Sequence, residues 1–190
     1  IRPEVADAIG LNVPVPVYCG LHDSNASLLP HLVGFGSPCT VVSTGTWVIC
    51  FGVGAKPHGL DPSRDTLVNV DANGHAVPSS RFMGGREWDL LTRDMAVVPM
   101  EEELTAAATV IDAGSMILPS VVKGTGPFPD SHVRWLNEPQ TTAERLAAAS
   151  LYEALMTQTC LDLIEAEGPI IVEGPFAANQ LYLRALHTLT

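Results

Sequence analysis

The feature that most restricts the fold of this sequence is an apolar strand–turn–strand pattern between Thr40 and Phe51. Residues 40–43 and 47–51 are rich in β-branched and aromatic side chains, and a short segment with a central glycine separates them. This pattern predicts a buried β-hairpin. Gly45 tolerates a positive φ, and Thr44 and Thr46 place hydroxyl groups beside free amides, so the turn suits a phosphate oxygen. An ordinary turn without a ligand is the other interpretation.

A polar stretch, His22-Asp23-Ser24, comes shortly before the hairpin. The apolar residues between Val15 and Tyr18 predict a buried strand that ends at Cys19-Gly20. Asp23 or Ser24 can cap a following short helix, which Pro30 would limit in length. The apolar face of that helix would carry Leu28, Leu29 and Leu32. A carboxylate at such a strand-to-helix junction would be fixed in position and face a cleft.

The C-terminal part predicts a second strand–turn–helix unit. Ile170-Ile171-Val172 contains no polar residue, so we expect a central strand that is covered on both faces. Gly174 follows it in a turn, and a helix with Tyr182 and Leu186 inward comes next. A strand, a glycine turn and a helix can present free amides to a nucleotide.

The two polar segments together resemble the FGGY family of sugar kinases, and within it the rhamnulokinase branch. The resemblance rests on residues 20–27, Gly-Leu-His-Asp-Ser-Asn-Ala-Ser, and on residues 43–47, Ser-Thr-Gly-Thr-Trp. It implies an α/β, actin-like ATPase (ribonuclease H-like) domain with a mixed sheet flanked by helices. It also implies transfer of the γ-phosphate of ATP, with Mg²⁺, to a hydroxyl of a rhamnulose-like or other short ketose.

The resemblance assigns roles to individual residues. Asp23 would be the general base, and Gly45 and Thr46 would contact the ATP phosphates. His22 and Ser24 flank the base and are candidates for hydrogen bonds to the sugar, although His22 could equally orient the base.

Two positions depart from the family pattern. At the glycine-rich adenosine motif only Gly174 remains, with Asn179 as a second candidate for ATP binding. Arg81 stands where rhamnulokinase relatives carry an asparagine that touches substrate. A substrate role for Arg81 therefore competes with a solvated or carboxylate-paired surface role.

The resemblance covers the chain from about Val15 to Leu189, and it implies that residues 1–190 are the C-terminal lobe of such a kinase. No Asp-x-Gly-Thr phosphate and magnesium stretch occurs in the sequence. We therefore expect an N-terminal lobe of the same kinase as partner, and an inactive fragment without it. A homodimer is left open. The alternative function is a non-catalytic sugar- or nucleotide-binding module of the same fold.

Two further readings of the polar stretch have weaker support. A hydrolase built on His22, Asp23 and Ser24 is disfavoured, because neighbouring residues cannot point at one another as a triad requires. A metal site on His22, Asp23 and His31 has no ordinary ligand spacing, so we expect no metal site on the protein itself.

Composition agrees with one acidic globular domain. The chain has 190 residues, is 46% hydrophobic and carries a formal net charge of −11, without a basic run. Nucleic acid and anionic membranes are therefore not expected as partners. The four cysteines form no Cys-x-x-Cys pair, and reduced thiols in a cytoplasmic protein are the simplest account.

Several other segments predict scaffold. Thr141 and Glu144 form a capping box before the longest helix, whose apolar face repeats every three to four residues. Residues 67–77 predict a second hairpin, and Trp88 lies on the buried side of a further helix. Glu101, Glu102 and Glu103 would open another helix, and we read them as structural. Residues 124–137 predict a loop rich in proline and glycine.

Overall fold

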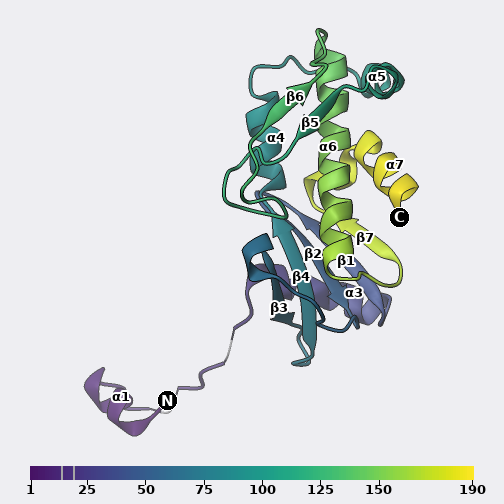
Figure 1. The fold of residues 1–190 in the computed structure, drawn as a ribbon. Coiled ribbons are helices and arrows are strands. Elements are labelled where there is room, and N and C mark those ends of the chain that lie inside the picture. The colour runs from purple at the N-terminus through teal and green to yellow at the C-terminus, as the bar shows by residue number, and fades with distance from the viewer. Residues whose placement is uncertain (14, 19) are drawn as a thin grey trace.

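The fold is built on a mixed five-stranded sheet (Figure 1). The structure, a computed structural model, describes residues 1–13, 15–18 and 20–190. The strand order is β3-β4-β2-β1-β7; β1 and β7 are parallel and the other neighbours are antiparallel. The strands are β1 (Cys39–Thr44), β2 (Val48–Val53), β3 (Thr66–Val70), β4 (Ala76–Phe82) and β7 (Ile170–Glu173). The expected α/β class and both hairpins are confirmed.

One face of the sheet packs against the long helix α6 (Thr142–Leu163) and the C-terminal helix α7 (Gln180–Leu189). Helix α6 begins at the expected capping box, with hydrogen bonds in both directions between Thr141 and Glu144. The buried side chains on this face come from alternate strand positions and from one side of α6: Val42, Val48, Cys50, Phe82, Tyr152, Met156 and Cys160. This cluster fixes the direction of α6 across the strands.

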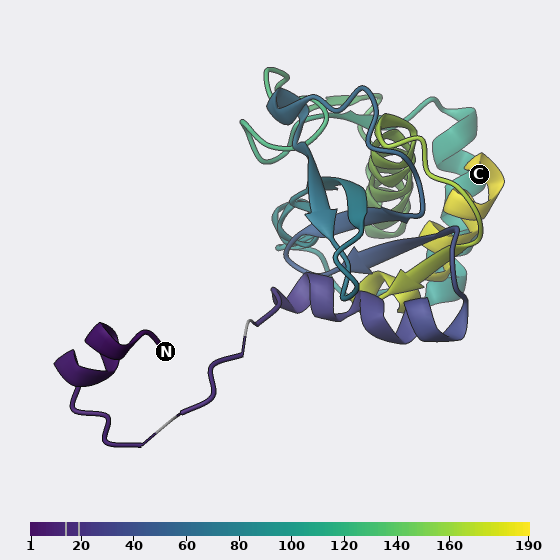
Figure 2. The same ribbon diagram turned by 90° about the horizontal axis from the view of Figure 1, so that it is seen from below.

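The opposite face is covered by helix α3 (Leu28–Gly34), which follows the short helix α2 (Asp23–Ala26). Figure 2 shows the sheet between α3 and α6. Leu28 is fully buried against Val41 and Phe51, whereas Leu29 is exposed. Pro30 does not limit the helix, because it lies in the first turn of α3, where a backbone N–H has no intrahelical acceptor.

The cap of α2 also differs from the expectation. The His22 side chain is the N-cap and accepts from the Ser24 amide, although the Asp23 carboxylate is closer to that amide, at 2.7 Å. Asp23 and Ser24 are themselves the first two residues of the helix. The polar stretch therefore starts the helix one residue earlier than predicted.

A third group of elements lies beyond the ends of the strands, towards the top of Figure 1. It contains α4 (Gly84–Thr92), α5 (Met100–Asp112) and a small sheet of β5 (Met116–Leu118) and β6 (Arg134–Leu136). The loop predicted for residues 124–137 thus includes one strand. Two 3₁₀ turns, η1 (Pro62–Arg64) and η2 (Pro175–Ala178), complete the chain.

The N-terminal residues lie apart from this body, with α1 (Pro3–Ala8) at the end of an extended arm (Figure 1). The strand predicted between Val15 and Tyr18 is wrong: these residues form no strand, and Tyr18 is 85% exposed. A strand needs a hydrogen-bonded neighbour, and the described residues of the arm pair with neither edge of the sheet. Pro14 and Cys19, to which this prediction also extended, lie outside the described residues.

Strand β7 corrects a second prediction, because it is the edge of the sheet among the described residues and is only half-buried. An apolar strand does not reveal from its sequence alone whether both its sides are covered. Cys39, Cys50 and Cys160 are free and buried, as expected. None of the helices in the described ranges is long and apolar enough to cross a membrane.

Candidate functional site

The turn between β1 and β2 is held from two sides by glycines of other elements. On one side Gly85 of α4 lies so close that a Cβ on it would overlap the carbonyl oxygen of Gly45. The Arg86 amide also donates to the Thr46 carbonyl at 3.3 Å. On the other side Gly174, at φ +82°, would meet the backbone of Thr44 if it carried a Cβ. The turn is therefore fixed against both α4 and the loop after β7.

Two details of this turn differ from the sequence prediction. Gly45 does not use a positive φ, and its amide donates to the Trp47 carbonyl at 2.9 Å. The Thr44 hydroxyl is not free for a ligand, because it donates to the Glu173 carbonyl (2.6 Å) and accepts from the Phe176 amide (3.0 Å). Of the two predicted hydroxyls, only that of Thr46 remains available.

A cavity of about 480 Å³ opens beside the turn. The predicted residues Gly45, Thr46 and Asn179 all line it, although they lie far apart in the sequence, and Gly174 immediately precedes its wall at Pro175. The remaining wall is partly aromatic and partly acidic: Gly85, Trp88, Asp89, Met100, Glu103, Pro175, Phe176 and Ala178. Among the described residues, no Lys or Arg lines this cavity, so an anion in it would depend on backbone amides and hydroxyl groups.

A chain of partly buried and buried hydrogen bonds supports one side of this cavity. Asn179 caps α7 by accepting from the Tyr182 amide (2.9 Å), and its Nδ2 donates to Ser150 Oγ (2.8 Å). Ser150 Oγ in turn donates to Glu103 Oε1 at 2.5 Å. Glu103 is thus a site residue that the sequence analysis missed. Three adjacent glutamates in a first helical turn indicate a solvated helix end, and only the packing of α5 on α6 shows that the third is buried.

The residues predicted to meet the sugar lie around a second, smaller cavity of about 180 Å³. His22, Ser24 and Arg81 line it, together with apolar residues of β2. Asp23 lines neither of these two cavities, and its side chain is 91% exposed. Its carboxylate lies 2.9 Å from His22 Nδ1. The structure therefore presents the proposed base to solvent at the start of α2.

Arg81 lines the smaller cavity and also contacts Trp47, the residue next to the turn that lines the larger cavity. Its guanidinium lies 4.6 Å from the centre of the Trp47 ring, and Trp47 directly follows Thr46 of the turn. Arg81 Nε also donates to Asp65 at 3.1 Å, and the second oxygen of Asp65 accepts from the Gly126 amide (2.7 Å). Arg81 is therefore carboxylate-paired, as one of the two predictions had it, and it also lines the smaller cavity; its substrate role stays a prediction.

Two buried carboxyl groups, Glu87 of α4 and Glu153 of α6, lie where these helices pack together. Burial raises the pKa of Glu87 above its ordinary value, although hydrogen bonds from the Val122 amide and the Tyr152 hydroxyl oppose the shift. Burial and then the nearby charge of Glu87 raise the pKa of Glu153 well above its ordinary value. Neither oxygen of Glu153 has a hydrogen-bond partner in the described part of the chain. The neutral acid is therefore the favoured form of Glu153.

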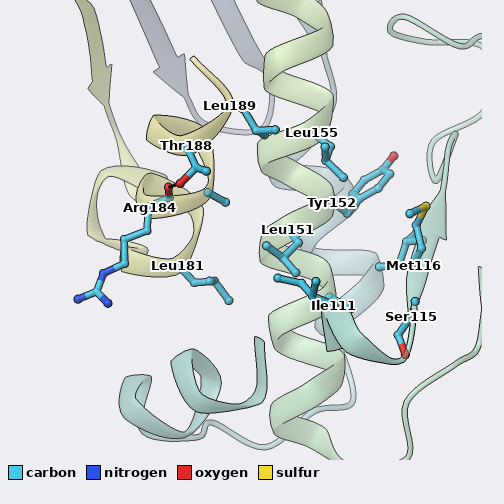
Figure 3. A pocket seen from close by; sticks show the side chains of 14 residues that line it. Ile111, Ser115, Met116, Leu151, Tyr152, Leu155, Leu181, Arg184, Thr188 and Leu189 are labelled. Carbon is cyan, nitrogen blue, oxygen red and sulfur yellow. Dashed lines mark hydrogen bonds between the residues drawn. The ribbon is translucent and has the colours of Figure 1, made fainter. Parts of the chain in front are cut away.

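A third cavity, of about 450 Å³, lies between α5, β5, α6 and α7 (Figure 3). Its lining is almost entirely apolar, including Leu151, Leu155 and Leu181, and Arg184 points away from it. Such a lining offers too few polar partners for a phosphate or a sugar. It is separate from the candidate site.

The metal site considered on His22, Asp23 and His31 is not formed. His31 instead pairs with Glu173 at 2.9 Å, which ties α3 to the end of β7. Burial alone would raise the pKa of Glu173, but its hydrogen bonds, the one to His31 foremost, lower it overall. Among the residues that the structure describes, no three His, Cys, Asp or Glu side chains group closely enough to hold a metal ion.

A comparison with models of protein families identifies the family to which this chain belongs. Residues 36–190 match the model for the C-terminal domain of the FGGY carbohydrate kinases. The chain belongs to the FGGY carbohydrate kinase family. The match begins after α3, so the polar stretch at His22 lies outside it. A comparison with curated proteins gave no match.

Solved structures of carbohydrate kinases show the same fold. A carbohydrate kinase from Novosphingobium aromaticivorans is 42% identical, with a TM-score of 0.84; the match covers 100% of this chain and 43% of that one. A xylulose kinase from Rhodospirillum rubrum is 18% identical, with a TM-score of 0.67, over 98% of this chain and 40% of that one. This FGGY chain therefore spans less than half the length of these solved relatives.

Proposed function

We propose that the complete protein is an ATP-dependent sugar kinase, which transfers the γ-phosphate of ATP to a hydroxyl of a rhamnulose-like or other short ketose. The chain described here supplies the C-terminal lobe, and an N-terminal lobe of the same kinase completes the site. The observation that carries the proposal is the 480 Å³ cavity, where the Gly45–Thr46 turn and the Asn179 loop meet.

The shape and chemistry of this cavity support a nucleotide. Gly45 and Thr46 place backbone and hydroxyl groups at one wall, where a phosphate can bind without a Lys or Arg side chain. Trp88 and Phe176 form an edge-to-face pair, with ring centres 5.9 Å apart, and supply an apolar surface for a base. Gly174 and Asn179 shape the opposite wall, and the glycine permits the close approach of this loop to β1.

In the proposed reaction Asp23 accepts the proton of the attacking sugar hydroxyl. The sugar oxygen attacks the γ-phosphorus in line, the bond from that phosphorus to the β–γ bridging oxygen breaks, and ADP leaves. We place the phosphate contact at Gly45 and Thr46. Because the Gly45 amide already donates to the Trp47 carbonyl, the Thr46 hydroxyl would steady the negative charge that develops on the phosphate oxygens. His22, Ser24 and Arg81 would bind the sugar. The reaction would use the Mg²⁺ of MgATP; in the described ranges of the chain, no three His, Cys, Asp or Glu side chains group closely enough to hold a metal ion by themselves.

Consumption of ATP by the complete protein over a panel of ketoses tests the proposal. We expect one ketose to stimulate turnover well above the rate with ATP alone, with a sugar phosphate as product. Nucleotide or sugar binding without turnover on any ketose would instead indicate the non-catalytic binding module. Failure to bind ATP at all would contradict the proposal.

A further inference from the structure

Glu103 is a buried acid with one oxygen bound and one oxygen unused. Only 6% of the residue is exposed, yet it lines the same cavity as the Gly45–Thr46 turn. Ser150 donates to its Oε1, and within the described ranges of the chain no group donates to its Oε2. This second oxygen is therefore available to accept a hydrogen bond from a molecule in the cavity.

The hydrogen bonds around Glu103 all run in one direction. The amide of Asn179 donates to Ser150, and the hydroxyl of Ser150 donates to Glu103. Since Ser150 has a single hydroxyl proton, this order leaves an acceptor at Glu103 and one free N–H on the Asn179 amide. Both residues line the cavity. The cavity therefore presents a fixed acceptor and a fixed donor to whatever fills it.

We propose that Glu103 recognises the nucleoside part of the nucleotide by accepting a hydrogen bond from it, and so contributes to the choice of nucleotide. This inference rests on the proposed function of the same cavity. The acid repels phosphate, so it belongs with an uncharged part of the ligand. A ribose hydroxyl and the exocyclic amine of adenine share the required chemistry, because each is a neutral hydrogen-bond donor.

The test compares binding of four nucleotides by the complete protein: ATP, 2′-deoxy-ATP, 3′-deoxy-ATP and ITP. Titration calorimetry gives each Kd without turnover. The wild-type protein is expected to bind ATP roughly tenfold more tightly than the analogue that lacks the recognised donor. Loss at a deoxy analogue identifies a ribose hydroxyl, and loss at ITP identifies the amine. Equal affinity for all four nucleotides would overturn the inference without any variant.

Glu103→Gln adds a donor in place of the free acceptor while keeping the size of the side chain. We expect it to weaken ATP binding and to remove most of the discrimination seen in the wild type. Glu102→Gln, on the same helix but exposed, is the matched control and should change neither. Unchanged discrimination in Glu103→Gln would refute the role of Glu103. If the wild type binds ATP and the Gln variant behaves like it, the proposed function survives; if the wild type binds no nucleotide, both fail.

Discussion

Gly85 of α4 lies directly against the carbonyl group of Gly45, with no room for a Cβ between them. Gly85→Ala should therefore push α4 away from the turn. Because the obstacle is backbone, we expect a loss of about 1–3 kcal/mol in the free energy of unfolding, together with weaker ATP binding. Denaturant unfolding and ATP titration measure the two effects. Gly34→Ala, at a helical position with open space around it, is the control and should cost nothing.

Valine in place of Thr46 should have a different effect from valine in place of Thr44. Thr46→Val removes a hydroxyl from a residue that lines the cavity, so the KM for ATP should rise roughly tenfold while the KM for the sugar changes little. Thr44→Val removes a hydroxyl that holds the loop after β7, so it should mainly lower stability. Steady-state kinetics and thermal unfolding of both variants check this. A larger effect of Thr46→Val on the sugar than on ATP would argue against a phosphate turn.

The effect of Arg81 on sugar binding should depend on the planar shape of its guanidinium group as well as on its charge. Lysine keeps the charge, but it cannot stack a planar group on Trp47 and bind Asp65 through a side nitrogen at once. We expect Arg81→Lys to raise the KM for the sugar roughly tenfold. Arg184→Lys, whose side chain points away from the apolar cavity, should leave sugar kinetics unchanged. Wild-type sugar kinetics in Arg81→Lys would limit Arg81 to a structural role.

Local patterns predicted the parts of the fold that depend on local structure. The hairpin around Gly45, the capping box at Thr141 and the strand–turn–helix unit at Gly174 were all correct, because turns, caps and periodic apolar faces are encoded within a few residues. The segment between Val15 and Tyr18 shows the limit. Its residues favour a strand, but strand formation depends on a partner that no local pattern reveals.

In the candidate site, too, local patterns predicted some residues, whereas others depend on how distant elements pack. Gly45, Thr46 and Asn179 were predicted from their motifs to bind ATP; the fold brings them to one cavity, and their role there stays a prediction. Glu103 could not be found in this way, because its burial depends on how α5 packs against α6. Whether β7 is central or at an edge likewise depends on which strands lie beside it, and not on its own residues.

Glu153 leads to a prediction about pH. Its pKa is raised in the folded state, so between about pH 4.5, where an ordinary glutamate ionises, and that raised pKa the folded chain holds one more proton than the unfolded chain. Its contribution to stability is complete below this window and is lost as the pH rises through it. Glu153→Gln cannot ionise, so the fall in unfolding free energy between pH 5 and pH 8 should become smaller. Parallel stability curves for the variant and the wild type, from urea unfolding at each pH, would contradict this.

The most direct test of the proposed phosphoryl transfer is Asp23→Asn in the complete protein, with kcat and the Kd for ATP measured side by side. The variant keeps the size of the side chain but cannot accept the proton of the sugar hydroxyl. We expect kcat to fall by roughly 10² to 10⁴ while the Kd for ATP stays at the wild-type value, because the Gly45–Thr46 cavity does not include Asp23. Turnover at the wild-type rate in Asp23→Asn would show that this carboxylate is not the base.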